Sequence, residues 1–201
     1  MISSRSTSLP ATKNARAAAI AIGVSSGAVR ALSEILPLLP RHFPLPVLIV
    51  VHLPPGEKSA LVDCFEGKCQ IAIREAEDKD PIVDGTIYFA PPDYHLLVEA
   101  DRRLSLSSEE PVLFSRPSID VLFESAADVY GAALIGIILT GASNDGAGGL
   151  KAIVAAGGTA LVQRPDLAQA SEMPQAALDA CPNALVLTLP QIANYLQQTV
   201  A

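Results

Sequence analysis

The sequence predicts an α/β fold: a doubly wound, mostly parallel sheet with helices on both faces and an antiparallel hairpin at one edge. Half of the 201 residues are hydrophobic, but only 4% are aromatic and there is no Trp. The apolar content is therefore mostly Ala, Val, Ile and Leu, which fill strands that helices cover on both sides. Along most of the chain, apolar runs also alternate with segments of helical periodicity.

The first elements follow this alternation. Apolar runs predict strands over residues 17–23 and 47–51. Between them, residues 29–39 place four aliphatic side chains on one helical face, which predicts a helix. Residues 58–65 follow a Pro-Pro-Gly turn and predict a short second helix.

The middle of the chain differs, because its short segments are separated by Asp, Gly and Pro turns, a spacing that predicts hairpins. From residue 118 onward helix and strand alternate again, with Ser118 expected as an N-cap. The predicted elements are short strands at 70–76, 86–90, 95–99 and 103–107, a helix at 118–129, a strand at 134–139, a helix at 147–156, strands at 159–162 and 184–187, and a helix at 191–198.

Composition sets the domain organisation and the environment. Residues 1–16 are rich in Ser and Thr, so we expect a flexible tail there and one domain over 17–201. A net charge of −7 argues against nucleic acid and anionic membranes as partners. No run approaches the ~18 apolar residues of a membrane span. Cys64, Cys69 and Cys181 lack zinc-site spacing, so we expect free thiols in a reducing cytoplasm, no metal and no cofactor.

Three polar residues follow predicted strands. Ser25 follows the first strand, His52 the second, and Asp145 a glycine-rich turn after residues 134–139. Ligands of an open parallel sheet bind at the carboxyl ends of its strands, so these side chains can meet there. A nucleophile, a base and an orienting carboxylate form a hydrolytic triad, in which Asp145 would accept the Nδ1 proton of His52.

Each of these residues also has a purely structural interpretation. Gly23-Val-Ser25-Ser-Gly27 has the spacing of a nucleophile elbow, but similar turns simply cap helices. His52 could be a partly buried histidine bonded to the backbone, and Asp145 could cap the next helix. His95 is a second candidate base, ranked lower because it lies in the hairpin region, and His42 is expected in solvent.

Six short motifs strengthen the catalytic interpretation. They are Ile22-Gly-Val-Ser25-Ser-Gly, His52-Leu-Pro-Pro-Gly56, Ala90-Pro-Pro-Asp-Tyr-His95, Arg116-Pro-Ser-Ile-Asp-Val-Leu-Phe123, Gly136-Ile-Ile-Leu-Thr-Gly-Ala-Ser-Asn-Asp-Gly146 and Met173-Pro174. Together, over about residues 17–198, the chain resembles the catalytic domain of the chemotaxis protein-glutamate methylesterase family (CheB type). The ordered set is far more specific than any single motif.

The resemblance implies a site as well as a fold. By motif, Ser25 is the nucleophile, His52 the base and Asp145 the orienting acid. Backbone N–H groups of Ser26 and Ala142 would form the oxyanion hole. The implied reaction is hydrolysis of glutamate γ-methyl esters with release of methanol, and deamidation of receptor glutamine through the same acyl intermediate. The implied partner is the methylated cytoplasmic region of chemoreceptors.

The resemblance also suggests pocket residues and shows three departures from the family pattern. Asn144, Arg116 and Met173 are candidate neighbours of the substrate. Ala28 stands where the family usually has a glycine, and Ala142-Ser143 stand where it usually has Met-Gly. Only a short tail precedes the motifs where the family often carries a phosphorylated receiver domain, so we expect any regulation to come from a separate protein.

Other functions stay open from the sequence. The chain could be an esterase for another methylated signalling protein, or a non-enzymatic binding module that keeps a degenerate site. A nucleotide-binding α/β domain is a more distant alternative, because the turn at 140–149 lacks the Walker lysine spacing.

Overall fold

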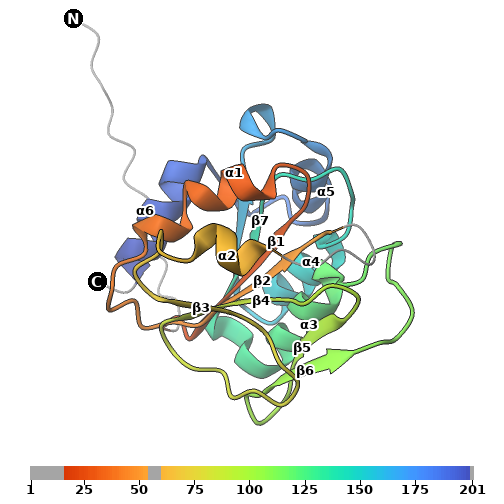
Figure 1. Ribbon diagram of the computed structural model, residues 1–201. Coiled ribbons are helices and arrows are strands. Elements are labelled where there is room, and N and C mark those ends of the chain that lie inside the picture. Colours follow the sequence, from red (N-terminus) through yellow and green to blue (C-terminus); the bar gives the residue numbers. More distant parts are fainter. Residues whose placement is uncertain (1–15, 54–59, 200–201) are drawn as a thin grey trace, which may run out of the picture.

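The computed structural model describes residues 16–53 and 60–199 and contains two sheets (Figure 1). Seven parallel strands form the main sheet in the order β3-β4-β2-β1-β7-β8-β9, and β5 and β6 form a separate antiparallel pair. The strands are β1 (Ala19–Val24), β2 (Val47–Val51), β3 (Ala72–Glu75), β4 (Thr86–Phe89), β5 (His95–Val98), β6 (Leu104–Ser107), β7 (Leu134–Ile138), β8 (Thr159–Gln163) and β9 (Leu185–Leu187).

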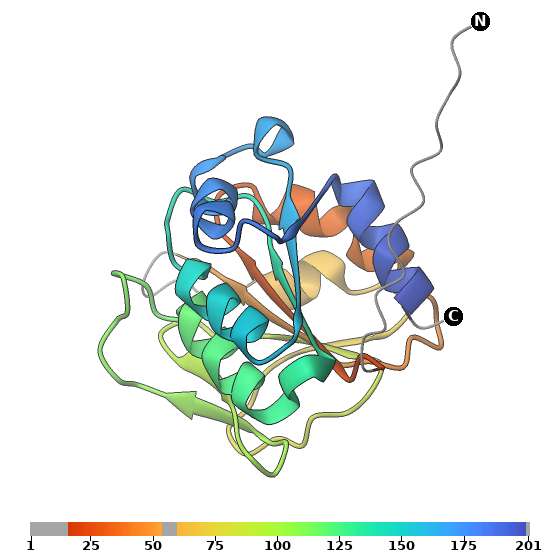
Figure 2. The same ribbon diagram turned by 180° about the vertical axis from the view of Figure 1, so that it is seen from behind.

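Helices cover both faces of the main sheet, as Figures 1 and 2 show from opposite sides. The predicted doubly wound α/β class is thereby confirmed. The helices are α1 (Ala28–Ser33), α2 (Leu61–Phe65), α3 (Ile119–Tyr130), α4 (Ala147–Ala155), α5 (Glu172–Ala180) and α6 (Leu189–Thr199), with 3₁₀ turns at Leu36–Leu38, Gly131–Ala133 and Pro165–Leu167.

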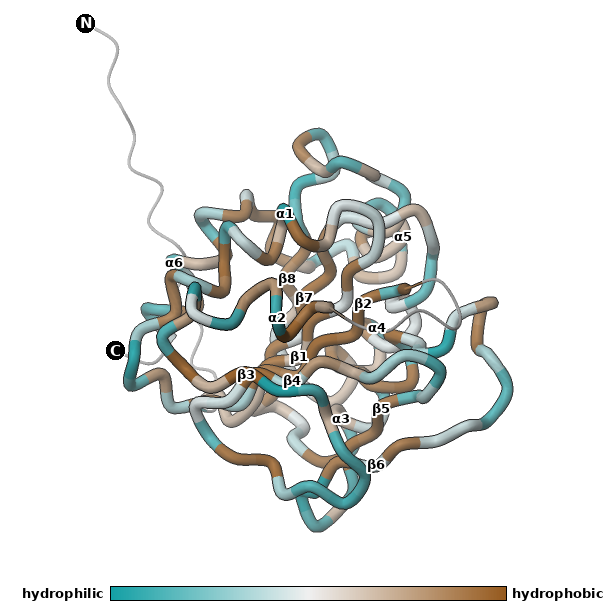
Figure 3. The backbone as a smooth tube through the Cα atoms, viewed as in Figure 1, coloured by the Kyte–Doolittle hydropathy of each residue, from teal (hydrophilic) through white to brown (hydrophobic). Residues whose placement is uncertain are grey.

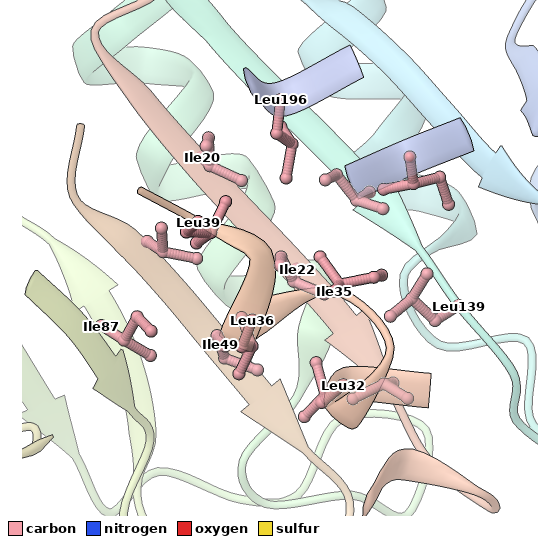
Figure 4. Packing of buried hydrophobic residues seen from close by; sticks show 14 of the residues in the cluster. Ile20, Ile22, Leu32, Ile35, Leu36, Leu39, Ile49, Ile87, Leu139 and Leu196 are labelled. Carbon is pink, nitrogen blue, oxygen red and sulfur yellow. The ribbon is translucent and has the colours of Figure 1, made fainter. Parts of the chain in front are cut away.

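Alternation along the strands divides the core into two layers. Ile20 and Ile22 of β1 point to the face covered by α1, α2 and α6, where they are fully buried (Figure 4). Ala19 and Ala21 point to the opposite face, which α3, α4, α5 and the β5–β6 hairpin cover. The strands at the centre of the molecule are accordingly its most continuously hydrophobic segments (Figure 3).

Two glycines bring helices close behind the central strands. A Cβ at Gly23 would lie 2.4 Å from Cγ2 of Ile119, the first residue of α3. A Cβ at Gly136 of β7 would lie 2.5 Å from Cδ1 of Ile153 in α4. Because both distances are far below van der Waals contact, only glycine lets the start of α3 lie directly behind β1.

The strand order creates a switch point between β1 and β7. From β1 the chain passes through α1 to β2 on one side, and β7 leads through α4 to β8 on the other. In doubly wound sheets the crevice at the carboxyl ends of such strands binds ligands. Ser25 follows β1 at this edge, and the turn that carries Asp145 follows β7.

Several predicted elements need correction. Segments 70–76 and 86–90 were expected in hairpins, but β3 and β4 pair in parallel. The connection between them bonds to the hairpin instead of turning back tightly: Lys79 N donates to Leu104 O (2.9 Å), and Leu104 N donates to Asp80 O (2.8 Å). The predicted antiparallel hairpin is present as β5–β6, but it packs on α3 and does not extend the edge of the main sheet.

Helix boundaries also differ from the prediction. The helix expected at 29–39 is divided into α1 and a 3₁₀ turn containing Pro37, a residue that cannot donate the backbone hydrogen bond an α-helix needs. The four aliphatic residues are nevertheless all buried. Helix α5 was not predicted, because few of its nine residues are buried and its apolar stripe is short. Residues 1–15, 54–59 and 200–201 lie outside the described residues, so the predicted tail and the start of the helix at 58–65 are not described.

Candidate active site

Ser25 and His52 occupy equivalent positions on neighbouring strands. The parallel register pairs Val24 with Val51, and strands in a sheet lie about 4.8 Å apart. His52 N donates to Val24 O (3.1 Å), and Ser25 N donates to Thr140 O (2.9 Å) in the turn after β7. Both side chains line one open pocket of about 370 Å³. Among the described contacts no hydrogen bond joins Ser25 Oγ to the His52 ring.

Asp145 contacts the imidazole ring of His52. Its side chain is completely buried, and its Oδ2 is 2.8 Å from Nε2 of His52, whose side chain is 12% exposed. The expectation that Nδ1 meets the carboxylate is therefore wrong, since Nε2 occupies that place. If Nε2 carries the proton shared with Asp145, Nδ1 is the ring nitrogen free to act as a base.

The amino end of α3 holds the Asp145 carboxylate. Ser118 Oγ donates to Oδ1 (2.8 Å), Ile119 N donates to Oδ2 (2.7 Å), and Asp120 N donates to Oδ1 (3.0 Å). Asp145 therefore caps α3, not the helix that follows it. Ser118 occupies the N-cap position as predicted, but its hydroxyl binds Asp145 instead of its own helix.

These donors determine the charge state of Asp145. Burial by itself would raise the pKa of this carboxyl, since a charge is costly away from water. The hydrogen bonds from His52, Asp120, Ile119 and Ser118 outweigh burial, so the pKa of Asp145 lies below its ordinary value. The site consequently presents an ionised carboxylate to the imidazole.

The start of α4 is held in turn by a carboxylate of α3. Asp120 Oδ1 accepts hydrogen bonds from Gly146 N (3.0 Å) and Gly149 N (2.6 Å) at the start of α4. Burial raises the pKa of Asp120, the bond from Gly149 lowers it, and the nearby charge of Asp145 raises it again, so the net shift is upward. The two carboxylates thus fasten the starts of α3 and α4 to each other.

The backbone at the two expected oxyanion donors is held in place. Within the described part of the chain, neither Ser26 N nor Ala142 N donates a hydrogen bond, and both residues are exposed. Thr140 Oγ1 donates to Ser26 O (2.8 Å) and accepts from Ala170 N (2.9 Å). This arrangement ties the turn after β1 to the turn after β7 while leaving the two N–H groups available.

Gly141 lies closely packed between Ser25 and the side chain of Met173. A Cβ at Gly141 would lie 2.9 Å from Cβ of Ser25 and 2.7 Å from Cε of Met173. Met173 is buried, and its N donates to Gly141 O (2.9 Å). Only a glycine at position 141 fits between Ser25 and Met173.

The other two predicted pocket neighbours lie elsewhere. Arg116 Nη1 donates to the carbonyl oxygens of Ser108 (2.9 Å) and Glu109 (3.0 Å), and Asn144 is exposed in the turn before Asp145. Neither of them, nor Met173, is among the described residues that line the pocket of Ser25 and His52. Their contact with substrate stays a prediction.

Sequence reasoning missed two glutamines of the site. Gln163 ends β8, is almost fully buried, and its Oε1 accepts from Thr140 N (2.8 Å). A polar residue at the end of a buried strand is the signal that could have identified it. Gln169 lines the pocket beside Ser25 and packs over Gly27, where a Cβ would lie 2.9 Å from its Oε1. It lies in an irregular segment, and no sequence pattern marks it.

The described residues offer neither a metal site nor a membrane-spanning helix. They contain no group of three or more His, Cys, Asp or Glu residues placed to hold a metal ion. Their helices include none that is long and apolar enough to cross a membrane. The three cysteines form no disulfide with one another.

Comparison with known proteins gives consistent matches over nearly the whole chain. A family model described as CheB methylesterase matches residues 20–196. A Leptospira interrogans protein, provisionally named protein-glutamate methylesterase/protein-glutamine glutaminase, is 50% identical over 176 residues, which are 88% of this chain and 91% of that protein. A Symbiobacterium thermophilum protein of the same name, without the qualification, is 36% identical over 181 residues, 90% of this chain and 50% of its own length.

A solved structure shares the fold. The Thermotoga maritima CheB methylesterase catalytic domain superposes with a TM-score of 0.88 at 30% sequence identity. The match covers 92% of this chain and all of that domain.

Proposed function

This chain belongs to the CheB methylesterase family, and we propose that it hydrolyses the γ-methyl esters of glutamate side chains in methylated chemoreceptors, using Ser25, His52 and Asp145. The contact between His52 Nε2 and Asp145 Oδ2 at 2.8 Å carries this assignment. It places a buried, ionised carboxylate behind an imidazole that shares a pocket with a serine. A helix-capping aspartate alone would not need that contact.

The proposed reaction begins with attack on the ester carbonyl. Ser25 Oγ forms a bond to the carbonyl carbon while its proton passes to Nδ1 of His52, and Asp145 stabilises the resulting imidazolium. The carbonyl electrons move onto oxygen, which accepts hydrogen bonds from the N–H groups of Ser26 and Ala142. These donors are proposed because their backbone is held by Thr140 and they are free of other bonds among the described residues.

The intermediate then collapses in the forward direction. The C–O bond to the methoxy group breaks, and the imidazolium proton goes to that oxygen, so methanol leaves and an acyl-serine remains. His52 next takes a proton from water, the hydroxide attacks the acyl carbon, and the proton returns to Ser25. With a glutamine side chain the same steps would release ammonia, in line with the glutaminase activity in the relatives' names.

The proposed partners follow from the family and the reaction. The substrate would be the methylated cytoplasmic region of a chemoreceptor, which places the enzyme in the cytoplasm. Departures from the family pattern at Ala142 and Ser143 leave this mechanism intact, because the oxyanion donor is a backbone group and Ser143 Oγ accepts from Asp145 N (3.1 Å).

The direct test measures methanol released from methylated receptor membranes. The wild-type chain should release it, and Ser25→Ala should lower the rate by about 10⁶-fold, to background. Ser33→Ala, which changes an exposed serine of α1, is the matched control and should have wild-type activity. Undiminished release by Ser25→Ala would overturn the assignment of the nucleophile.

Two further outcomes separate the alternative functions. Hydrolysis of a small ester such as p-nitrophenyl acetate without methanol release from receptor would indicate an esterase for another methylated protein. A chain that cleaves neither substrate, and whose Ser25 resists a serine-directed acylating probe, would be a binding module. Either result would contradict the proposed receptor substrate.

A further inference from the structure

His95 is a buried histidine that the reaction does not use. It begins β5 and is only 2% exposed. Both of its ring nitrogens have partners: Ser118 N donates to Nδ1 at 3.1 Å, and Nε2 lies 3.1 Å from the carbonyl oxygen of Glu110. With neither nitrogen facing a substrate, His95 is unsuited to be the alternative base that the sequence suggested.

The hydrogen-bond partners of His95 determine which ring nitrogen carries the proton. A backbone N–H can only donate, so Nδ1 must accept and carries no proton. A carbonyl oxygen can only accept, so Nε2 must carry the proton. The ring is therefore neutral, in a single tautomer and orientation.

Ser118 connects this ring to the proposed catalytic acid. Its backbone N binds His95, and its hydroxyl donates to Asp145 Oδ1 at 2.8 Å. The next two backbone N–H groups, of Ile119 and Asp120, bind the same carboxylate. A continuous series of hydrogen bonds thus runs from His95 through Ser118 and Asp145 to His52.

We propose that His95 is a positioning residue: its Nδ1 fixes Ser118 and the first turn of α3, so that Asp145 keeps its orientation toward His52. The proposal rests on the proposed function, because it concerns the geometry of that triad. A displacement of about 1 Å at a reacting group can cost about 100-fold in rate, so a loosened α3 start would lower catalysis without changing the pocket that binds substrate.

A second hydrogen bond offers an internal control. Val98 N, at the other end of β5, donates to Ser125 Oγ of α3 at 3.1 Å. This bond joins the same strand and helix as the one from Ser118 to His95, and β5 lies beside α3 along their length (Figure 1). Among the described residues, Ser125 has no hydrogen bond to Asp145, because its hydroxyl donates to Val121 O and Leu122 O. Ser125→Ala therefore weakens the packing of the hairpin without touching the acid.

Two substitutions of His95 distinguish the roles of its two ring nitrogens. In His95→Asn the amide oxygen takes the place of Nδ1 and keeps an acceptor for Ser118 N. In His95→Gln the amide nitrogen reaches the place of Nε2 and keeps the donor to Glu110 O, but the acceptor is lost. Both variants lose ring volume and one hydrogen bond, so a merely structural role predicts equal effects.

The experiment measures kcat and KM for p-nitrophenyl acetate and for methylated receptor, with the melting temperature of each variant. His95→Gln should lower kcat at least tenfold, up to the roughly 100-fold that a displacement of about 1 Å can cost, with KM within about twofold. In contrast, His95→Asn and Ser125→Ala should stay within about threefold of wild type. Equal losses for Asn and Gln, or a loss for Ser125→Ala as large as for Gln, would overturn the proposal.

A second measurement needs no variant. Long-range ¹H–¹⁵N NMR of the histidine rings should show His95 as the neutral Nε2–H tautomer, and a Nδ1–H or doubly protonated ring at neutral pH would contradict the proposal. Kinetics with the small ester also separate failure of the proposed function from failure of the proposed role of His95. If the receptor is not a substrate, the proposed function fails, while the Asn and Gln comparison on p-nitrophenyl acetate still tests His95.

Discussion

Asp145 and Asp120 both cap helices, Asp145 at the start of α3 and Asp120 at the start of α4. Asp145, in the turn before α4, accepts two backbone N–H groups from the start of α3. Asp120, in the first turn of α3, accepts two from the start of α4. Yet the pKa of Asp145 is lowered and that of Asp120 is raised. Asp145 is fully buried, whereas Asp120 keeps partial contact with solvent.

The difference lies in the remaining contacts. Asp145 also receives the Ser118 hydroxyl and faces His52, so four donors stabilise its charge against the cost of burial. Burial is the main cause that raises the pKa of Asp120, and the negative charge of Asp145 beside it raises that pKa further. Helix capping accounts for a carboxylate at both positions, but the bond to an imidazole occurs at only one. We infer that catalysis is separable from capping, so substitutions of Asp145 and Asp120 should differ in their effect on kcat.

The largest effect should come from Asp145→Asn. The amide places an NH₂ group against donors, and it cannot stabilise an imidazolium, so kcat should fall about 10⁴-fold. The free energy of unfolding should also fall by about 1–3 kcal/mol, because buried N–H groups lose their acceptor. Methanol release and urea denaturation measure the two effects. Retention of more than a tenth of the wild-type kcat would refute the role of Asp145.

Ser118→Ala should have an intermediate effect. It removes one of the four donors to Asp145 but leaves the carboxylate, the imidazole and the backbone bond to His95. We expect a decrease of about 1 kcal/mol in the free energy of unfolding. The kcat should fall about tenfold, since each hydrogen bond contributes to orientation. An unchanged kcat would show that the backbone donors of Ile119 and Asp120 suffice.

At acid pH the two carboxylates should change the free energy of unfolding in opposite directions. The folded pKa of Asp145 lies below its unfolded value of about 3.9, so its contribution to stability is present above that pH and is lost as the pH falls through the folded pKa. The raised folded pKa of Asp120 acts oppositely, because protonation favours its folded form. Relative to wild type, unfolding free energy measured from pH 7 to pH 2 should fall less in Asp145→Asn and more in Asp120→Asn. The reverse order would contradict the assigned directions.

The smallest effect should come from Asp120→Asn at neutral pH. The amide oxygen can still accept from Gly146 N and Gly149 N, and the substitution removes a charge that opposes ionisation of Asp145. We therefore expect kcat within about threefold of wild type and a stability change below about 1 kcal/mol, the size of one neutral hydrogen bond. A loss as large as that of Asp145→Asn would show that the two carboxylates act as one unit.

The parts of this structure that sequence patterns predict are those set by local periodicity. Apolar runs located β1, β2 and β7 and therefore the strand ends at Ser25, His52 and the turn of Asp145. The parallel pairing of β3 with β4 could not be predicted, because the connection between them is held by Leu104, far along the chain, whose carbonyl oxygen accepts from Lys79 N and whose N donates to Asp80 O.

The fine structure of the site depends on contacts that no local pattern encodes. Ser118 was expected to cap its own helix, but its hydroxyl is directed to Asp145, 27 residues away. Which imidazole nitrogen meets the carboxylate depends on how β2 and the Asp145 turn are placed relative to each other. The role of Gln169 likewise arises only when the 3₁₀ turn at Pro165–Leu167 brings its segment over Gly27.

The central claim is that Ser25 is activated by His52 and Asp145. The rate at which a fluorophosphonate labels Ser25, followed by mass spectrometry of the intact chain and of its peptides, tests it most directly. We predict one label per wild-type chain, located on Ser25, with labelling slowed at least 100-fold in His52→Ala and in Asp145→Asn, and unchanged in Asp120→Asn. Equal labelling of wild type and His52→Ala, or a label on another serine, would contradict the account.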